Sequence, residues 1–161
     1  MPKNTLYLET SVFGFYYDDE AQNILRKNAV RQLFTQINSG KFIPIVSPLT
    51  VKELSKSPSP HRETLLSLLE KLQVKEIQID EKELETLAEK YIAEGIIPED
   101  FADDARHIAF ATISKVDILL SYNLKHIANE WKIRKINSVN LREGYNLLTV
   151  RSPEEVIEYE D

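Results

Sequence analysis

Residues 103–123 read DDARHIAFATISKVDILLSYN, and this stretch decides the fold that the sequence predicts. Small and apolar side chains recur at helical spacing around its first half: Phe101, Ala105, Ile108, Ala109 and Thr112. We therefore predict a helix that buries one stripe. The apolar run 118–120 is typical of a strand buried on both faces. Ser121 and Asn123 follow that strand, where open α/β sheets place their ligand sites.

The rest of the chain alternates strand-like and helix-like segments. The patterns predict further strands at residues 5–8, 42–46, 74–79, 133–136 and 147–150. Start and stop residues predict helices from Asp18 or Asp19 to 38, from 48 toward the proline-rich break at 57–60, and at 61–72, 81–93, 124–131 and 152–157. Asn137 is a further predicted cap, with Gly144 as its stop. The aromatic segment 12–17 is predicted to be a loop. This alternation implies one α/β domain, residues 1–161, with a mainly parallel sheet covered by helices on both faces.

Composition narrows the class of protein. Of the 161 residues, 42% are hydrophobic and 29% are charged, as in one globular domain. The chain has no cysteine, which excludes disulfides and thiolate metal sites. No apolar run approaches the roughly 20 residues of a membrane span, and the polar start is too short for a signal peptide. We therefore expect a cytoplasmic protein with no membrane partner.

The net charge of -6 hides an uneven distribution. Residues 76–104 hold eleven acidic and two basic side chains, whereas residues 105–137 hold six basic and two acidic ones. An acidic cluster beside a basic segment can hold a metal ion next to a phosphate backbone. Two solvated helix faces of opposite sign would give the same pattern.

Four polar side chains are predicted to meet at corresponding ends of the sheet: Glu9, Glu53, Asp104 and Asn123. Glu9 follows the first strand, and Glu53 lies in the second turn of the helix after the second strand. Mg²⁺ and Mn²⁺ take carboxylate and water oxygens from scattered elements. The set therefore suits hydrolysis of a phosphodiester by metal-activated water.

Other chemistries have less support. The four glycines build no phosphate-binding loop, and the chain has neither a thiol nucleophile nor a Gly-x-Ser-x-Gly elbow. The histidines, His61, His107 and His126, lack zinc spacing. His107 lies three residues after Asp104, so it could orient that carboxylate or contact a phosphate. A half-buried helix histidine with satisfied hydrogen bonds is the more usual outcome.

Four motifs span most of the chain in a fixed order: YLETSV at 7–12, SPLTVKEL at 47–54, DARHIAFA at 104–111 and DILLSYNLKH at 117–126. In this order they resemble the PIN-domain family, which contains the VapC-like ribonuclease toxins of type II toxin–antitoxin systems. The resemblance implies a three-layer α/β/α sandwich and cleavage of RNA that depends on Mg²⁺ or Mn²⁺. It also implies a homodimer and, often, a cognate antitoxin protein encoded alongside.

The resemblance also implies roles for single residues. Glu9, Glu53 and Asp104 would bind the metal directly or through water, and Asn123 would complete the catalytic set. Ser121 would join Asn123 in orienting water or substrate. The residues expected near the phosphates are Lys125, His126 and Arg106.

Two positions depart from the family pattern. The family usually has aspartate at the position of Glu9, and commonly another acid at the position of Asn123. Glutamate carries its carboxylate farther from the backbone, and asparagine contributes no negative charge to hold a dication. Asp103 is the better candidate to compensate, because Asp117 is predicted at the opposite end of its strand.

Two other functions stay open. A PIN fold whose altered acids no longer cut would bind RNA or a protein partner, with an affinity that ignores Mg²⁺ and the Glu53→Gln substitution. A phosphoryl-signalling domain, similar in outline to response-regulator receivers, would need paired acids after the first strand. Glu9 stands alone there, so this hypothesis ranks last. For the aromatic residues of 12–17, core or dimer contacts are favoured over base stacking.

Overall fold

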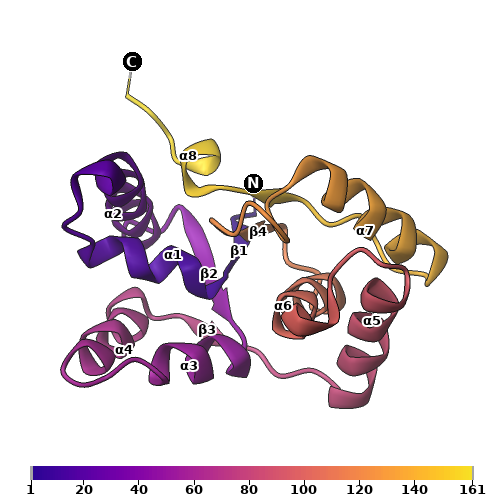
Figure 1. The fold of residues 1–161 in the computed structure, drawn as a ribbon. Helices are drawn as coiled ribbons and strands as arrows, with labels where there is room; N and C mark the ends of the chain where they lie inside the picture. The colour runs from indigo at the N-terminus through magenta and orange to yellow at the C-terminus, as the bar shows by residue number, and fades with distance from the viewer. Residues whose placement is uncertain (1, 161) are drawn as a thin grey trace.

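A computed structural model describes residues 2–160 of the chain. Its centre is a five-stranded sheet in the order β3-β2-β1-β4-β5, and all neighbouring strands pair in parallel (Figure 1). The strands are β1 (Asn4–Leu8), β2 (Phe42–Val46), β3 (Lys75–Glu76), β4 (Ile118–Leu120) and β5 (Val150–Arg151). The predicted α/β class with a parallel sheet is confirmed.

Helices connect the strands and cover both faces of the sheet. They are α1 (Thr10–Gly14), α2 (Ile24–Asn38), α3 (Pro48–Ser55), α4 (His61–Leu72), α5 (Glu81–Ala93), α6 (Ala102–Ile113), α7 (Glu130–Arg142) and α8 (Pro153–Val156). Short 3-10 helices add η1 (Phe15–Tyr17), η2 (Ala21–Asn23) and η3 (Glu99–Phe101). Within residues 2–160, none of the helices has the length and apolar character to cross a membrane.

The sheet separates two hydrophobic cores, which makes the molecule a three-layer α/β/α sandwich. In β1, Leu6 and Leu8 point into the core formed with α1–α4 and α8, whereas Tyr7 points into the core formed with α5–α7. Successive side chains of a strand face opposite sides, so the buried run of β1 supplies both cores. Figure 1 shows the two helical layers on either side of the strands.

The strand order reverses direction at β1. The chain places β2 and β3 on one side of β1 and then returns to place β4 and β5 on the other. A crevice forms outside the carboxyl ends of strands at such a switch point, and ligands bind there. The backbone N–H of Glu9 donates to the carbonyl oxygen of Leu120 at 3.0 Å, which joins the ends of β1 and β4. Glu9 and Ser121 therefore meet where the fold favours a ligand site.

Several predicted elements are confirmed. Helices α4 and α5 have the predicted limits, and the Ser47 hydroxyl caps α3 by accepting from the backbone N–H of Thr50 at 3.2 Å. The stripe of α6 is buried at Ala105, Ile108, Ala109 and Thr112. Phe101 is the exception: it precedes α6, and 45% of its surface is exposed. The segments 74–79 and 147–150 contribute only the short edge strands β3 and β5.

The region after β4 was predicted wrongly. Residues 133–136 belong to α7 and form no strand, and the segment predicted as a helix at 124–131 is a turn followed by the start of α7. Ile133 and Ile136 lie three residues apart and pack together on the α5–α6 side of the core, a helical spacing that a short apolar run can hide. Asn129 caps α7 by accepting from the backbone N–H groups of Trp131 and Lys132.

Two other boundaries differ from the prediction. Helix α2 begins at Ile24, because Asp18 instead accepts from the backbone N–H of Glu20 and the Asn23 side chain in an irregular turn. The aromatic segment 12–17 is helical, in α1 and η1, and forms no loop. Phe13 is fully buried in the α1–α4 core, which agrees with the expected core role of this segment.

Asn140 ties α7 to the helices beside it. Its side-chain oxygen accepts from the Tyr91 hydroxyl of α5, and its Nδ2 donates to Thr112 of α6 at 3.2 Å. We expect Asn140→Ala to lower the free energy of unfolding by about 1–3 kcal/mol, because buried groups lose their partners. Chemical denaturation measures this, with Ser138→Ala on the exposed face of α7 as the control. Equal stability of the two variants would contradict the prediction.

Candidate metal centre

Glu9 is held by the ends of the two central strands. It follows β1 and caps α1, where its Oε2 accepts from the backbone N–H of Ser11 at 3.2 Å. Its Oε1 accepts from the hydroxyls of Ser11 at 2.5 Å and of Ser121, just past β4, at 2.7 Å. Glu9 is only 5% exposed, so these donors replace the water that a carboxylate loses on burial.

Glu53 and His107 reach the same place from α3 and α6. The Glu53 Oε1 atom accepts from the Thr10 hydroxyl at 2.6 Å and lies 2.5 Å from His107 Nε2. The His107 side chain is 1% exposed and that of Glu53 is 25% exposed. The pair therefore links α1, α3 and α6, with Glu53 on the open side and His107 behind it.

A buried hydrogen-bonded chain fixes the imidazole of His107. Its Nδ1 lies 2.6 Å from the Tyr7 hydroxyl, which lies 2.7 Å from the Ser47 hydroxyl and 3.3 Å from that of Thr50. Both ring nitrogens of His107 have a partner, so the ring orientation is set from behind by β1 and the start of α3. Ser47, which caps α3, is therefore linked by hydrogen bonds through Tyr7 to His107 of the candidate centre.

The charges of Glu53 and His107 support each other. Burial acts to lower the pKa of His107, but Tyr7, the hydrogen bond to Glu53 and the Glu9 carboxylate outweigh it and raise this pKa to about 10. Burial acts to raise the pKa of Glu53, and the hydrogen bond from His107 outweighs it, so this pKa is lowered. Near neutral pH the pair is therefore an imidazolium and a carboxylate.

Glu9, Glu53 and His107 form a cluster that can hold a metal ion. Each offers one ligand atom, and these three atoms lie within 4.8 Å of one another. Carboxylate oxygens suit Mg²⁺ and Mn²⁺, whereas imidazole nitrogen suits transition metals, so a site that used all three would favour Mn²⁺ over Mg²⁺. His107 must lose its proton to become a ligand. If it keeps the proton, it orients Glu53 from the second layer of the site.

Asp104 lies on the same helix but has a different partner. Its Oδ2 is 3.0 Å from Nδ1 of His126, whose ring packs on Phe101 with 4.3 Å between centroids. The spacing of His107 suggested that it orients Asp104. In the structure it does not, because its Nε2 faces Glu53 of α3 instead. His126 is 4% exposed and is bound to a carboxylate. Asp104 is not a member of the three-residue cluster, and its side chain is 18% exposed near the start of α6.

Asn123 and Lys125 belong to the turn between β4 and α7. The side-chain oxygen of Asn123 accepts from the backbone N–H of His126 at 3.1 Å, so it shapes this turn. The backbone N–H of Asn123 donates to the Ser121 hydroxyl at 2.9 Å, which in turn donates to Glu9. Lys125 is exposed and makes no ion pair among the described residues.

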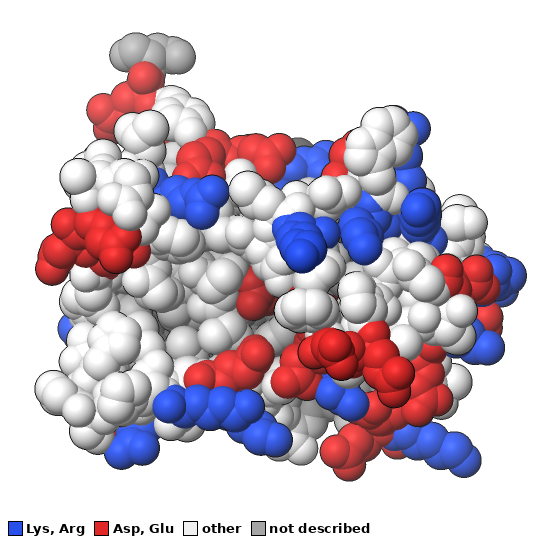
Figure 2. Space-filling model, in the orientation of Figure 1, with Lys and Arg blue, Asp and Glu red and all other residues white. Residues whose placement is uncertain are grey.

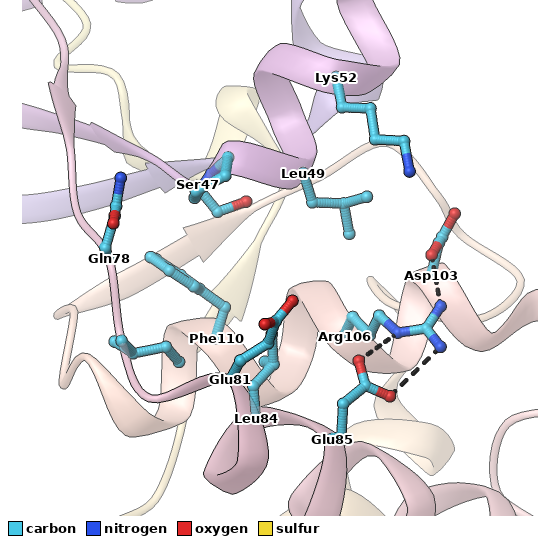
Figure 3. A pocket seen from close by; sticks show the side chains of 12 residues that line it. Ser47, Leu49, Lys52, Gln78, Glu81, Leu84, Glu85, Asp103, Arg106 and Phe110 are labelled. Carbon is cyan, nitrogen blue, oxygen red and sulfur yellow. Dashed lines mark hydrogen bonds and ion pairs between the residues drawn. The ribbon is translucent and has the colours of Figure 1, made fainter.

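Arg106 faces a separate cleft. It donates to Glu85 and Asp103, both at 2.7 Å, in the cleft of about 670 Å³ that opens between α3, α5 and α6 (Figure 3). These carboxylates raise the pKa of Arg106 and engage its guanidinium. Asp103 therefore points toward Arg106, not toward Glu9 and Glu53. Asp117 binds the backbone and hydroxyl of Thr5 at the amino end of β1, as its predicted position requires.

One face of the molecule has a hollow with charged side chains around it. Figure 2 shows this face hollowed between the α1–α4 layer and the α5–α7 layer, with acidic side chains in and below the hollow. Basic side chains gather above it, over α7 and the turn before it. The uneven charge along the sequence is therefore an uneven charge in space.

The sequence identified two members of the cluster and missed the others that support it. Glu9 and Glu53 were predicted, but His107 was not predicted as a ligand, and Tyr7, Thr10 and Ser11 were quoted only as part of the motif at 7–12, without a role. A tyrosine between the two buried leucines of β1 was the available signal, because a buried hydroxyl needs a polar partner.

No protein-family model matches this chain, and no curated protein gives a significant match to its sequence. Function is therefore inferred from the sequence motifs and from the geometry of the cluster.

Proposed function

We propose that this protein is a metal-dependent ribonuclease of the PIN type. The observation that carries the proposal is the buried cluster of Glu9, Glu53 and His107 at the switch point of a parallel sheet. Two carboxylates fixed there by hydroxyl donors can hold a divalent cation without rearrangement of the backbone. The four ordered sequence motifs support the choice of RNA as the substrate. The homodimer and the antitoxin that the resemblance implies belong to the same proposal.

Glu9 and Glu53 would hold the ion, with His107 or Asp104 as the third ligand or its orienting group. A bound Mg²⁺ or Mn²⁺ supplies a hydroxide-like water and neutralises charge on the phosphate. The chain itself keeps Glu9 in place through Ser11 and Ser121, and it keeps Glu53 in place through Thr10. The donor set fits Mn²⁺ better than Mg²⁺ when His107 joins it.

The residues around the hollow would hold the RNA. Lys125 is exposed in the turn between β4 and α7 and can contact a phosphate. His126 is hydrogen-bonded to Asp104 and its ring packs against Phe101. It would therefore shape the surface that contacts the RNA and would not bind a phosphate directly. Arg106 is engaged by Glu85 and Asp103, which makes it a support of α6 more than a phosphate ligand.

One observation favours the second candidate, a PIN-fold module that binds RNA or a protein partner without cutting. The raised pKa of His107 places a positive charge beside Glu53 and Glu9. An imidazolium there offsets one of the two carboxylate charges without a metal ion, and the hydroxyl donors to Glu9 support the other. In that case the cluster is structural, and the protein functions through its surface.

A metal titration separates the two functions. We expect saturable binding of Mn²⁺ by isothermal calorimetry, tighter than that of Mg²⁺. Affinity should fall at least about 10-fold in Glu9→Gln and in Glu53→Gln, because each removes a charged ligand. Asp104→Asn should have a smaller effect than either, because Asp104 is bound to His126.

The control is Glu70→Gln, an exposed acid of α4 that makes no ion pair among the described residues. Circular dichroism checks that each variant keeps the helix content of the parent. No heat of binding up to millimolar metal would reject the nuclease and leave the non-cutting module.

A further inference from the structure

A basic surface with one exposed aromatic ring begins in the turn that follows Ser121, the residue whose hydroxyl donates to Glu9. We call it the α7 rim and define it by Lys125, Trp131, Arg134 and Lys135. Trp131 is 70% exposed, and the Arg134 guanidinium lies over its ring with 5.4 Å between Cζ and the centroid. An indole this exposed at the start of a helix adds little to the core, so packing within this chain does not explain it.

Most of the charge on the α7 rim is unneutralised. Among residues 2–160, Lys125 and Lys135 make no ion pair, and Arg134 pairs only with the exposed Glu130 at 2.8 Å. Pairs as exposed as that one are weak, so Arg134 remains available to a stronger anion. Figure 2 shows the basic side chains over α7 set apart from the acidic ones over α5 and the start of α6.

A series of hydrogen bonds along residues 121–131 connects the α7 rim to Glu9 of the candidate metal centre. Ser121 donates to Glu9, and two residues later Asn123 accepts from the backbone N–H of His126. Asn129 then caps α7 at Trp131 and donates from Nδ2 to the Leu124 carbonyl oxygen at 3.2 Å. The turn from 121 to 129 is therefore braced at both ends, so Trp131 has a defined position relative to the cluster.

We propose that the α7 rim binds a single-stranded segment of RNA that extends from the candidate metal centre, with one base stacked on Trp131. Bases stack on exposed aromatic rings regardless of sequence, and lysine and arginine beside the ring take the phosphates. This inference rests on the proposed function, because that function supplies the substrate class. It adds the position at which the flanking strand is held.

The chemistry of the α7 rim favours RNA over a protein partner. The core of a protein interface is apolar and depleted of lysine, whereas here Arg134 lies over Trp131 and Lys135 is exposed one helical turn from it. A second copy of this chain, with its net charge of -6, could bind this surface through acidic side chains. Such charges would pair with the lysines but would not explain the exposed indole. Single-stranded RNA satisfies the ring and the charges at once.

Trp131 is the only tryptophan of the chain, so its fluorescence reports on the α7 rim alone. The probe is a 2′-O-methyl oligopyrimidine of about ten nucleotides, which resists cleavage and spans a typical single-strand site. With a chelator present, we expect this probe to quench Trp131 fluorescence in a saturable way. A labelled copy should bind Trp131→Ala about 5- to 150-fold more weakly, as measured by anisotropy.

The charges are tested by salt dependence. Lys125→Gln and Lys135→Gln should each reduce the slope of log affinity against log salt by about one, because each removes one phosphate contact. Lys71→Gln, on α4 in the opposite layer, should leave both affinity and slope unchanged.

Unchanged affinity of Trp131→Ala for the labelled probe would overturn the proposal, as would equal quenching by polyglutamate, which would mean an acidic protein partner. Fluorescence that changes with protein concentration alone would mean a second copy. These outcomes are independent of the metal titration, because the probe is bound without metal. If the protein binds the probe but no metal, this inference stands and the proposed nuclease function is rejected. If it binds metal but not the probe, the nuclease function stands and this inference is rejected.

Discussion

The Glu53→Gln variant should lose RNA cleavage in the presence of Mn²⁺ by about 100-fold or more. Removing a group that only orients a metal ligand typically costs 10- to 100-fold, and Glu53 is proposed as a ligand itself. The substitution keeps the size of the side chain and leaves an oxygen that can accept from Thr10 and His107. The variant should therefore fold as the parent does while holding the ion more weakly.

Cleavage is measured on a fluorophore-quencher RNA with protein purified in parallel from the same host. Glu70→Gln again serves as the control, since it removes one negative charge from the exposed face of α4. Activity that survives in Glu53→Gln, with the same Mn²⁺ dependence as in Glu70→Gln, would mean that the cleavage comes from another site or from a contaminant.

The fold was largely predictable because hydrophobic periodicity dominates its elements. The buried runs of β1 and β4 each supply both cores, and such runs are legible in a sequence. The cap at Ser47 and the stop at Gly95, with φ +75°, fixed helix limits through local chemistry. These signals depend on neighbouring residues, so they need no knowledge of the tertiary structure.

The failures lie where tertiary contacts override a local signal. The sequence at 133–136 reads IRKI, which fits a short strand as well as a helix turn. In the structure Ile133, Ile136 and Val139 pack at helical spacing on the α5–α6 core, and Asn140 adds hydrogen bonds to Tyr91 and Thr112 of α5 and α6. No pattern within α7 reveals those partners.

The site followed the same rule. Glu9 and Glu53 were predicted because they follow strands in a parallel sheet. The spacing of His107 predicted a local partner, Asp104, but its partner is Glu53, which reaches it at 2.5 Å from α3 in the other helical layer. Asp104 in turn is taken by His126 from the following turn. Residue spacing describes one helix, whereas these partners come from other elements, Glu53 from α3 and His126 from the turn after β4.

Without metal, the stability of the protein should fall as the pH rises from about 6.5 toward 10. The pKa of His107 is about 10 in the folded protein against an ordinary 6.5, so the folded state holds this proton more tightly than the unfolded state. The stabilisation is complete below pH 6.5 and is lost as the pH passes through 10, with an upper limit of about 5 kcal/mol. Urea denaturation at several pH values, with a chelator present, measures it.

His107→Gln should flatten this dependence, whereas His61→Gln, at an exposed position of α4, should retain it. The affinity for Mn²⁺, measured by calorimetry at several pH values, then tests the role of His107. If His107 becomes a ligand, each ion displaces its proton, and Mn²⁺ affinity rises about 10-fold per pH unit below 10. If His107 keeps its proton and orients Glu53, the affinity is nearly independent of pH in this range. A flat affinity together with active cleavage would assign the ion to the carboxylates alone and leave His107 as the group that positions them.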